Sequence, residues 1–155
     1  MTEPSAVHGV FTLERTYDAT PARVFAAWSS AEARAQWFHG PEGWEAEIRE
    51  VDFRVGGHER TRGRFPDGRI SDFQATYHDI VPDRRIVFVY DMYVNATKIS
   101  VSLATVTIAP AGAGARLTIT EQGVFLDGFD DAGGREHGTA LLLDHLAAAL
   151  ERQIA

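Results

Sequence analysis

The chain has 155 residues, of which 22 are acidic, 15 are basic and none is cysteine, giving a formal net charge of −7. This length suits one domain, and 45% hydrophobic residues are enough for a sizeable core, so a disordered chain is excluded. The negative charge argues against a nucleic-acid partner, and the lack of cysteine removes disulfides, thiolate metal ligands and cysteine nucleophiles.

The first elements predicted along the chain are one strand and two short helices. In residues 9–18, a mostly apolar set of side chains on one face alternates with a mostly polar set on the other. This period of two is typical of a half-buried strand. Thr20 and Pro21 then supply an N-cap hydroxyl and a proline at the first helical position. Ser30 can cap a second short helix.

Strands and turns follow from residue 44 to residue 125. The expected strands cover residues 45–51, 58–65, 70–81, 86–94, 98–109 and 116–123. Glycine, proline and aspartate residues form turn sequences between them, as in Pro66-Asp67-Gly68. Because these connections are too short for parallel crossovers, we expect seven antiparallel strands in all.

The last segment predicts one long helix. Gly133 and Gly134 leave open the residue at which it begins. Its apolar stripe consists of Leu142, Leu143, Leu146, Ala149 and Leu150. Extended toward the helix start, the same stripe carries Thr139 and Arg135. The inner face of this helix should therefore be apolar at one end and polar at the other.

This order of elements resembles the helix-grip fold of the START/Bet v 1-like (SRPBCC) superfamily. That α+β fold wraps a seven-stranded curved antiparallel sheet around a long C-terminal helix, with two short helices after strand one. Four segments resemble the AHSA1-like family, named after the activator of Hsp90 ATPase, within that superfamily: PARVFAAW (21–28), QWF (36–38), DFRVGG (52–57) and DIVPDRRIVF (79–88). The stretch TEQGVFLDG (120–128) resembles one bacterial branch of the family.

Glu121 is the strongest candidate for a functional charge. It shares a strand face with Leu117 and Ile119, so it should point inward. A buried carboxylate needs a partner, and Arg135 is the nearest candidate in sequence. A structural ion pair, or a register that exposes Glu121 to solvent, is as good an interpretation as ligand recognition.

Aromatic side chains occur on two neighbouring strands. Phe73 and Tyr77 share one face of the first strand, and Phe88, Tyr90 and Met92 share one face of the next. Aromatic rings with polar tips suit a pocket for an apolar ligand, although each residue alone also fits an ordinary core. The predicted ligand-binding residues are Trp28, Trp37, Phe38, Phe73, Tyr77, Phe88, Tyr90, Met92, Glu121, Arg135, Thr139 and Leu142.

Three further features of the sequence are weaker candidates for sites. Arg60, Arg62 and Arg64 alternate on one strand face in line with His58, and we favour a solvated outer face balanced by acids over an anion site. The six histidines show no metal-ligand spacing, and no nucleophile elbow or phosphate loop is present. The apolar stretch 124–129 is interpreted as a lid over a cavity, with helix packing or a dimer contact as alternatives.

The first functional hypothesis is a non-catalytic, cofactor-free binder of a small apolar or amphipathic molecule between sheet and helix. The second is an enzyme of the cyclase, aromatase or hydrolase kind that uses Glu121 and a tyrosine, Tyr77 or Tyr90, for proton transfer. The third, implied by the family resemblance, is an Hsp90-type chaperone interaction module. No membrane span or signal peptide is predicted, so we expect one cytoplasmic bacterial domain over residues 1–155, with its core at about 9–152 and a homodimer left open.

Overall fold

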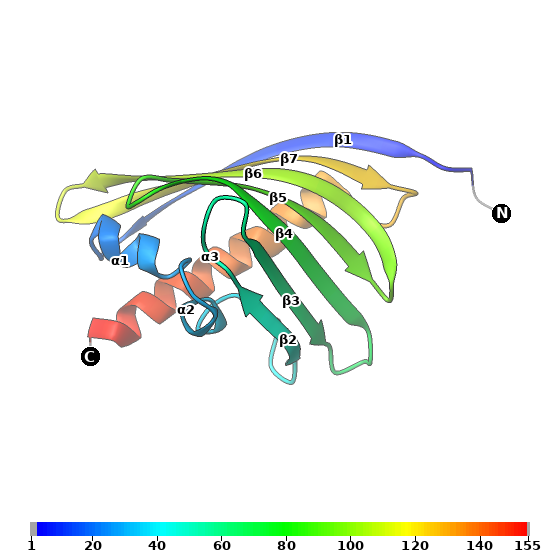
Figure 1. Cartoon of the computed structure of the whole chain (residues 1–155), viewed down its shortest axis with the longest axis horizontal. Coiled ribbons are helices and arrows are strands. Elements are labelled where there is room, and N and C mark those ends of the chain that lie inside the picture. Colours follow the sequence, from blue (N-terminus) through cyan, green and yellow to red (C-terminus); the bar gives the residue numbers. More distant parts are fainter. Residues whose placement is uncertain (1–2, 155) are drawn as a thin grey trace.

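The computed structural model describes residues 3–154 and shows one curved sheet with helices on its concave side (Figure 1). The strands are β1 (Ala6–Tyr17), β2 (Glu45–Val51), β3 (His58–Arg64), β4 (Ile70–Val81), β5 (Arg85–Val94), β6 (Thr97–Ala111) and β7 (Gly114–Leu126). The helices are α1 (Pro21–Ala26), α2 (Ala31–Ala35) and α3 (Ala132–Ile154). All strand pairs are antiparallel, in the order β1-β7-β6-β5-β4-β3-β2, so the predicted α+β helix-grip fold is confirmed.

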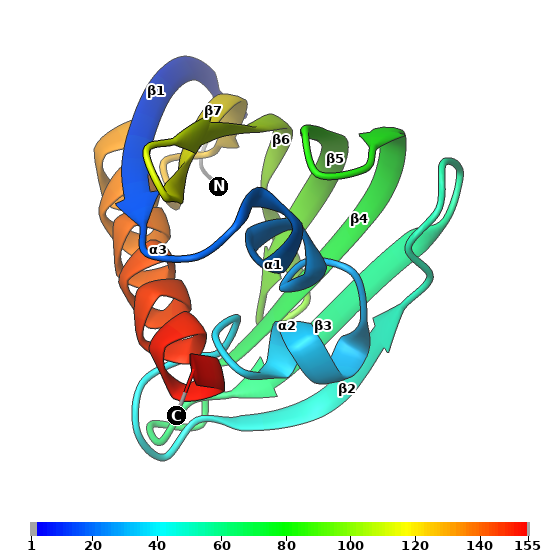
Figure 2. The ribbon, with the colours of Figure 1, turned by 90° about the vertical axis from the view of Figure 1, so that its left-hand side faces the viewer.

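The sheet curves strongly, and α3 lies at the open side of the curve. Figure 2 shows the sheet wrapped from β1 round to β2, with α3 next to β1 and the short helices at one end. Two register shifts accompany this curvature: His78 is an extra residue in β4 opposite β5, and Ile99 is an extra residue in β6 opposite β5. An extra residue in one strand bends it and increases its local twist. Bulges in β4 and β6 therefore help to hollow the concave face.

The helix starts are fixed by capping side chains. The Thr20 hydroxyl accepts a hydrogen bond from the backbone N–H of Arg23 at 3.2 Å, and the Ser30 hydroxyl accepts one from Ala33 at 3.1 Å. Both predicted caps are thus confirmed. Helix α3 begins at Ala132, because the Asp131 carboxylate accepts from the Gly134 N–H at 2.7 Å.

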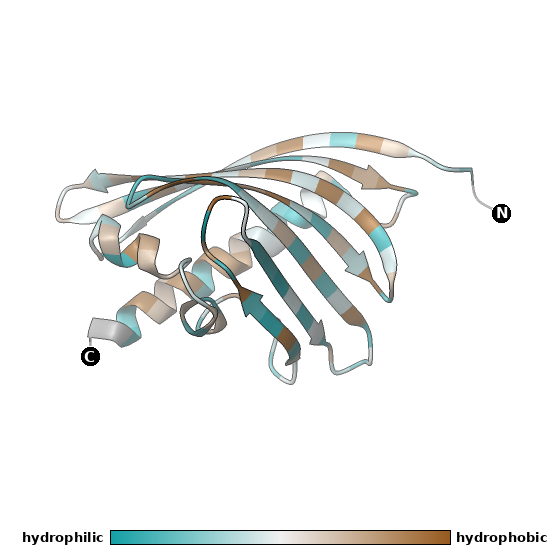
Figure 3. Ribbon diagram, viewed as in Figure 1, coloured by the Kyte–Doolittle hydropathy of each residue, from teal (hydrophilic) through white to brown (hydrophobic). Residues whose placement is uncertain are grey.

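Helix α3 presents the mixed inner face that its sequence predicts. Leu143 and Leu146 are buried toward its C-terminal end, whereas the buried residues near its start are Arg135 and Thr139. Figure 3 shows the alternation of apolar and polar residues along the strands that face this helix. No helix within residues 3–154 is both long and apolar enough to cross a membrane.

The prediction of a lid at residues 124–129 is wrong for its first half, because residues 124–126 belong to β7. Strand β1 starts earlier than expected, at Ala6, and pairs with β7 as far as Leu126, while β6 pairs with Phe125 from the other side. With partners on both sides the backbone stays in the sheet. Phe125 is buried, and the exposed Phe129 lies in the short connection to α3.

The packing of α3 can be tested with two leucines of the same helix. Leu146→Ala should lower the free energy of unfolding by about 2–5 kcal/mol, because it opens a void in a fully buried position. Leu141→Ala, at a side chain that is 48% exposed, should stay within about 0.5 kcal/mol of the wild type. Urea unfolding measures both, and equal losses would contradict this placement of the helix.

Candidate functional site

A cavity of about 510 Å³ lies between α3 and the concave face of the sheet. Its size falls in the range of small-molecule sites, about 300–1,000 Å³. The α3 residues that line it include Gly138, where an added Cβ would meet no atom within 4 Å. The exposed Pro41 and Leu141 also line it and mark its side toward solvent.

The structure brings the predicted ligand-binding residues together around this cavity, with one exception. The lining includes Trp28, Trp37, Phe38, Phe73, Phe88, Tyr90, Met92, Glu121, Arg135, Thr139 and Leu142. Tyr77 lies outside it, because its hydroxyl donates a hydrogen bond to Glu59 at 2.7 Å behind the aromatic wall. The Phe73 ring stacks obliquely on Tyr90, with centroids 4.7 Å apart, and meets Phe38 edge to face at 4.9 Å. These contacts hold the aromatic wall in place.

Glu121 points inward, as its strand position predicts, and is 5% exposed. Its carboxylate accepts hydrogen bonds from the Tyr90 hydroxyl and, at 3.3 Å, from the Thr139 hydroxyl. The expected direct pair with Arg135 does not form, because the Tyr90 hydroxyl lies between them and accepts a hydrogen bond from Arg135 at 2.8 Å. Arg135 also donates to Ser100 at 2.8 Å and pairs with Asp130 at 3.2 Å.

Burial dominates the electrostatics of this cluster. It raises the pKa of the Glu121 carboxyl above the usual range, and the contacts with Tyr90, Arg135 and Thr139 oppose the shift only in part. Burial and the facing Glu121 carboxylate likewise raise the pKa of Tyr90. The raised pKa lets the Glu121 carboxyl stay protonated, and so donate a hydrogen bond, at a higher pH than an ordinary carboxyl.

A second buried charge cluster was not predicted. Arg34 on α2 and Glu59 on β3 are each 2% exposed and form a side-on ion pair, in which Arg34 donates to the carboxylate through Nε at 3.0 Å and Nη2 at 2.6 Å. The guanidinium also lies over the Phe38 ring, 3.8 Å from its centroid. Arg34 lines the cavity, while Glu59 lies behind it and accepts from Tyr77.

A signal for Glu59 was present in the sequence. If Arg60, Arg62 and Arg64 face outward, alternation places Glu59 and Thr61 inward.

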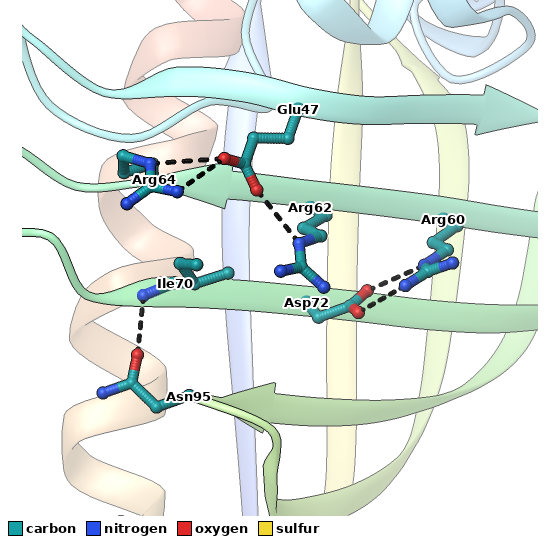
Figure 4. Close-up of polar contacts among 7 residues, drawn as sticks. All are labelled: Glu47, Arg60, Arg62, Arg64, Ile70, Asp72 and Asn95. Atoms are coloured by element: carbon teal, nitrogen blue, oxygen red, sulfur yellow. Dashed lines mark hydrogen bonds and ion pairs between the residues drawn. The ribbon is translucent and has the colours of Figure 1, made fainter.

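The arginine row of β3 lies on the outer face, as we favoured, and takes no part in the cavity (Figure 4). Arg60 forms a two-point contact with Asp72, at 3.2 and 2.8 Å. Arg62 and Arg64 share the Glu47 carboxylate at 3.0 Å each. No group of three or more histidine, aspartate or glutamate side chains that could hold a metal ion occurs in the described part of the chain.

Comparison with known proteins places the chain among relatives of the same fold. The sequence profile described as activator of Hsp90 ATPase homolog 1-like protein matches residues 18–151. A Rhizobium leguminosarum protein is 44% identical, with a TM-score of 0.92 over 97% of this chain and 99% of its own. A Rhizobium loti protein is 46% identical, with a TM-score of 0.84 over 94% and 99%. The AHSA1-like protein of Aeromonas hydrophila, 19% identical, shares the fold with a TM-score of 0.74 over 94% of each chain. None of the curated proteins matches the chain.

The burial of Glu121 should make stability depend on pH. A carboxyl whose pKa is higher in the folded than in the unfolded protein loses stability as the pH rises through the range between the two values. Glu121→Gln removes this loss, so the melting temperature of the variant relative to wild type should increase as the pH rises above the usual carboxyl pKa range of about 4–5. Glu14→Gln, at an exposed position of β1, serves as the control and should show no such trend. A constant difference for Glu121→Gln would contradict the raised pKa.

The Arg34–Glu59 pair should behave as a coupled buried ion pair. Arg34→Met leaves the carboxylate buried without its cation and should cost about 3–5 kcal/mol of unfolding free energy. Adding Glu59→Leu should recover much of that loss, because the carboxylate left without Arg34 is no longer buried. Denaturant unfolding of both single variants and the double variant completes the cycle. A double variant as unstable as the sum of the singles would show that the pair is not coupled.

Proposed function

The chain belongs to the family of activator of Hsp90 ATPase homolog 1-like proteins, and on this premise we propose that it binds a small apolar or amphipathic molecule between its sheet and α3. The family and the fold are consistent with a ligand-binding domain. The observation that carries the finer proposal is the cavity of about 510 Å³, whose wall is mostly aromatic and aliphatic with a few buried polar groups.

The wall of the cavity favours a ligand with an apolar body. Phe38, Phe73 and Phe88 lie on the side of the sheet and short helices, and Leu142 and Leu143 lie opposite on α3. Transfer of apolar surface from water to such a wall contributes about 25 cal/mol per Å². A flat or ring-containing molecule would contact both sides at once.

The polar groups would orient the ligand. Glu121 faces the cavity and can donate or accept a hydrogen bond according to its protonation, while Thr139 and Tyr90 hold its carboxyl in position. A hydroxyl or carbonyl on the ligand near this end would find a partner whose own position is already fixed. Such preorganisation reduces the entropy that binding costs.

The same carboxyl favours a second candidate, an enzyme of the cyclase, aromatase or hydrolase kind in which Glu121 and Tyr90 transfer a proton. The observation behind it is the raised pKa of Glu121 beside a buried tyrosine in a cavity. Glu121→Gln distinguishes the two once a substrate is known. An enzyme loses turnover with a modest loss of binding, whereas a binder has no turnover to lose.

Binding can be tested with 1-aminoanthracene, a neutral apolar fluorophore. The wild type should give a saturable rise in fluorescence. Leu142→Trp, which adds a ring to the cavity wall, should weaken binding at least about tenfold, equivalent to ~1.4 kcal/mol. Ala148→Trp, on the exposed side of the same helix, should bind as the wild type does. No saturable binding to the wild type, or equal binding to Leu142→Trp, would contradict the proposal.

A further inference from the structure

One corner of the cavity has hydrogen-bonding capacity that the protein does not use. The buried side-chain atoms without a partner among the described residues include Trp28 Nε1, Arg34 Nη1 and Thr61 Oγ1, and all three residues line the cavity. Each residue is at least nine-tenths buried, and each of the three atoms is closed off from solvent, so a ligand group reaches it only when neighbouring side chains move. An unpaired buried polar group costs about 1–3 kcal/mol, so three at one place call for an explanation.

The three groups lie in the same corner. The Arg34 guanidinium carbon is 5.1 Å from the centroid of the Trp28 ring. Thr61 follows Glu59 by two residues on β3, so its side chain is on the same strand face as the carboxylate that binds Arg34. Glu59 occupies Nε and Nη2 of the guanidinium and leaves Nη1 free. All three free groups can donate a hydrogen bond, and two of them can only donate.

The local charge is also unbalanced toward the positive side. Arg49 on β2 lies near this pair, and burial together with the neighbouring Arg34 lowers its pKa. Its Nη2 donates to the backbone carbonyl of Phe38 at 2.8 Å. Two guanidinium groups thus face one carboxylate, Glu59, which leaves an excess of one positive charge. At the opposite end Arg135 has Asp130, Ser100 and Tyr90 as partners.

We propose that the corner formed by Trp28, Arg34 and Thr61 is a subsite for a carboxylate, so that the ligand is an apolar molecule with a carboxylate at one end. Three donors and an excess positive charge match the acceptor oxygens and negative charge of that group. The apolar body extends from there along the aromatic wall toward Glu121. This inference rests on the proposed function and specifies its ligand class.

Two probes that share one ring system test the subsite by fluorescence titration: 2-anthracenecarboxylate and the neutral 2-(hydroxymethyl)anthracene. The wild type should bind the carboxylate at least about tenfold more tightly, as expected for hydrogen bonds to a charged group. Thr61→Val and Trp28→Phe should each reduce this preference. Ala148→Trp, on the exposed side of α3 and outside the cavity lining, should leave the preference unchanged.

Thr61→Val also separates binding from folding. Valine has the shape of threonine without the unpaired hydroxyl, so the melting temperature of the ligand-free variant should equal or exceed that of the wild type. Substitution of Arg34 would be a poorer test, because it leaves Glu59 buried without its partner.

The outcomes distinguish the two proposals. Equal binding of both anthracene probes, or a carboxylate preference that survives both Thr61→Val and Trp28→Phe, would overturn the subsite and leave the binding function standing. Failure of both probes and of 1-aminoanthracene to bind the wild type would overturn the binding function itself.

Discussion

The architecture of this protein depends on the buried polar residues in the first half of α3. Arg135 and Thr139 lie on the face that meets the sheet, where a buried charge is tolerated only with partners. They find these partners in Tyr90 and Glu121, so hydrogen bonds rather than close apolar packing connect this half of the helix to the sheet. The other half packs through residues such as Leu146. The helix is thus held at both ends, with the cavity alongside its polar half.

This arrangement explains how the space can persist without collapse. The Arg34–Glu59 pair connects α2 to β3 on one side, and the Glu121 cluster connects α3 to β5 and β7 on the other. Each cluster is directional, because its hydrogen bonds require particular side-chain positions. The aromatic side chains between them are held by edge-to-face contacts with one another. A cavity with aromatic walls and polar ends suits a ligand that is apolar in the middle and polar at its ends.

Most of the fold could be predicted because its strands and helices follow from the local periodicity of apolar and polar residues. Period-two alternation gave the strands and their faces, including the inward position of Glu121 and the outward position of Arg60. The partner of Glu121 could not be predicted from the sequence. The Tyr90 hydroxyl lies between Glu121 and Arg135, and this position depends on side-chain geometry between distant elements. The extension of β7 to Leu126 was missed for a related reason, since neighbouring strands decide where a strand ends.

The most direct test of the account is a high-resolution crystal structure of the protein with 2-anthracenecarboxylate bound. The account predicts the ring between Phe73 and Leu142, with a carboxylate oxygen about 3 Å from Arg34 Nη1. A cavity filled by rearranged side chains, or one that holds only water at saturating probe, would contradict it.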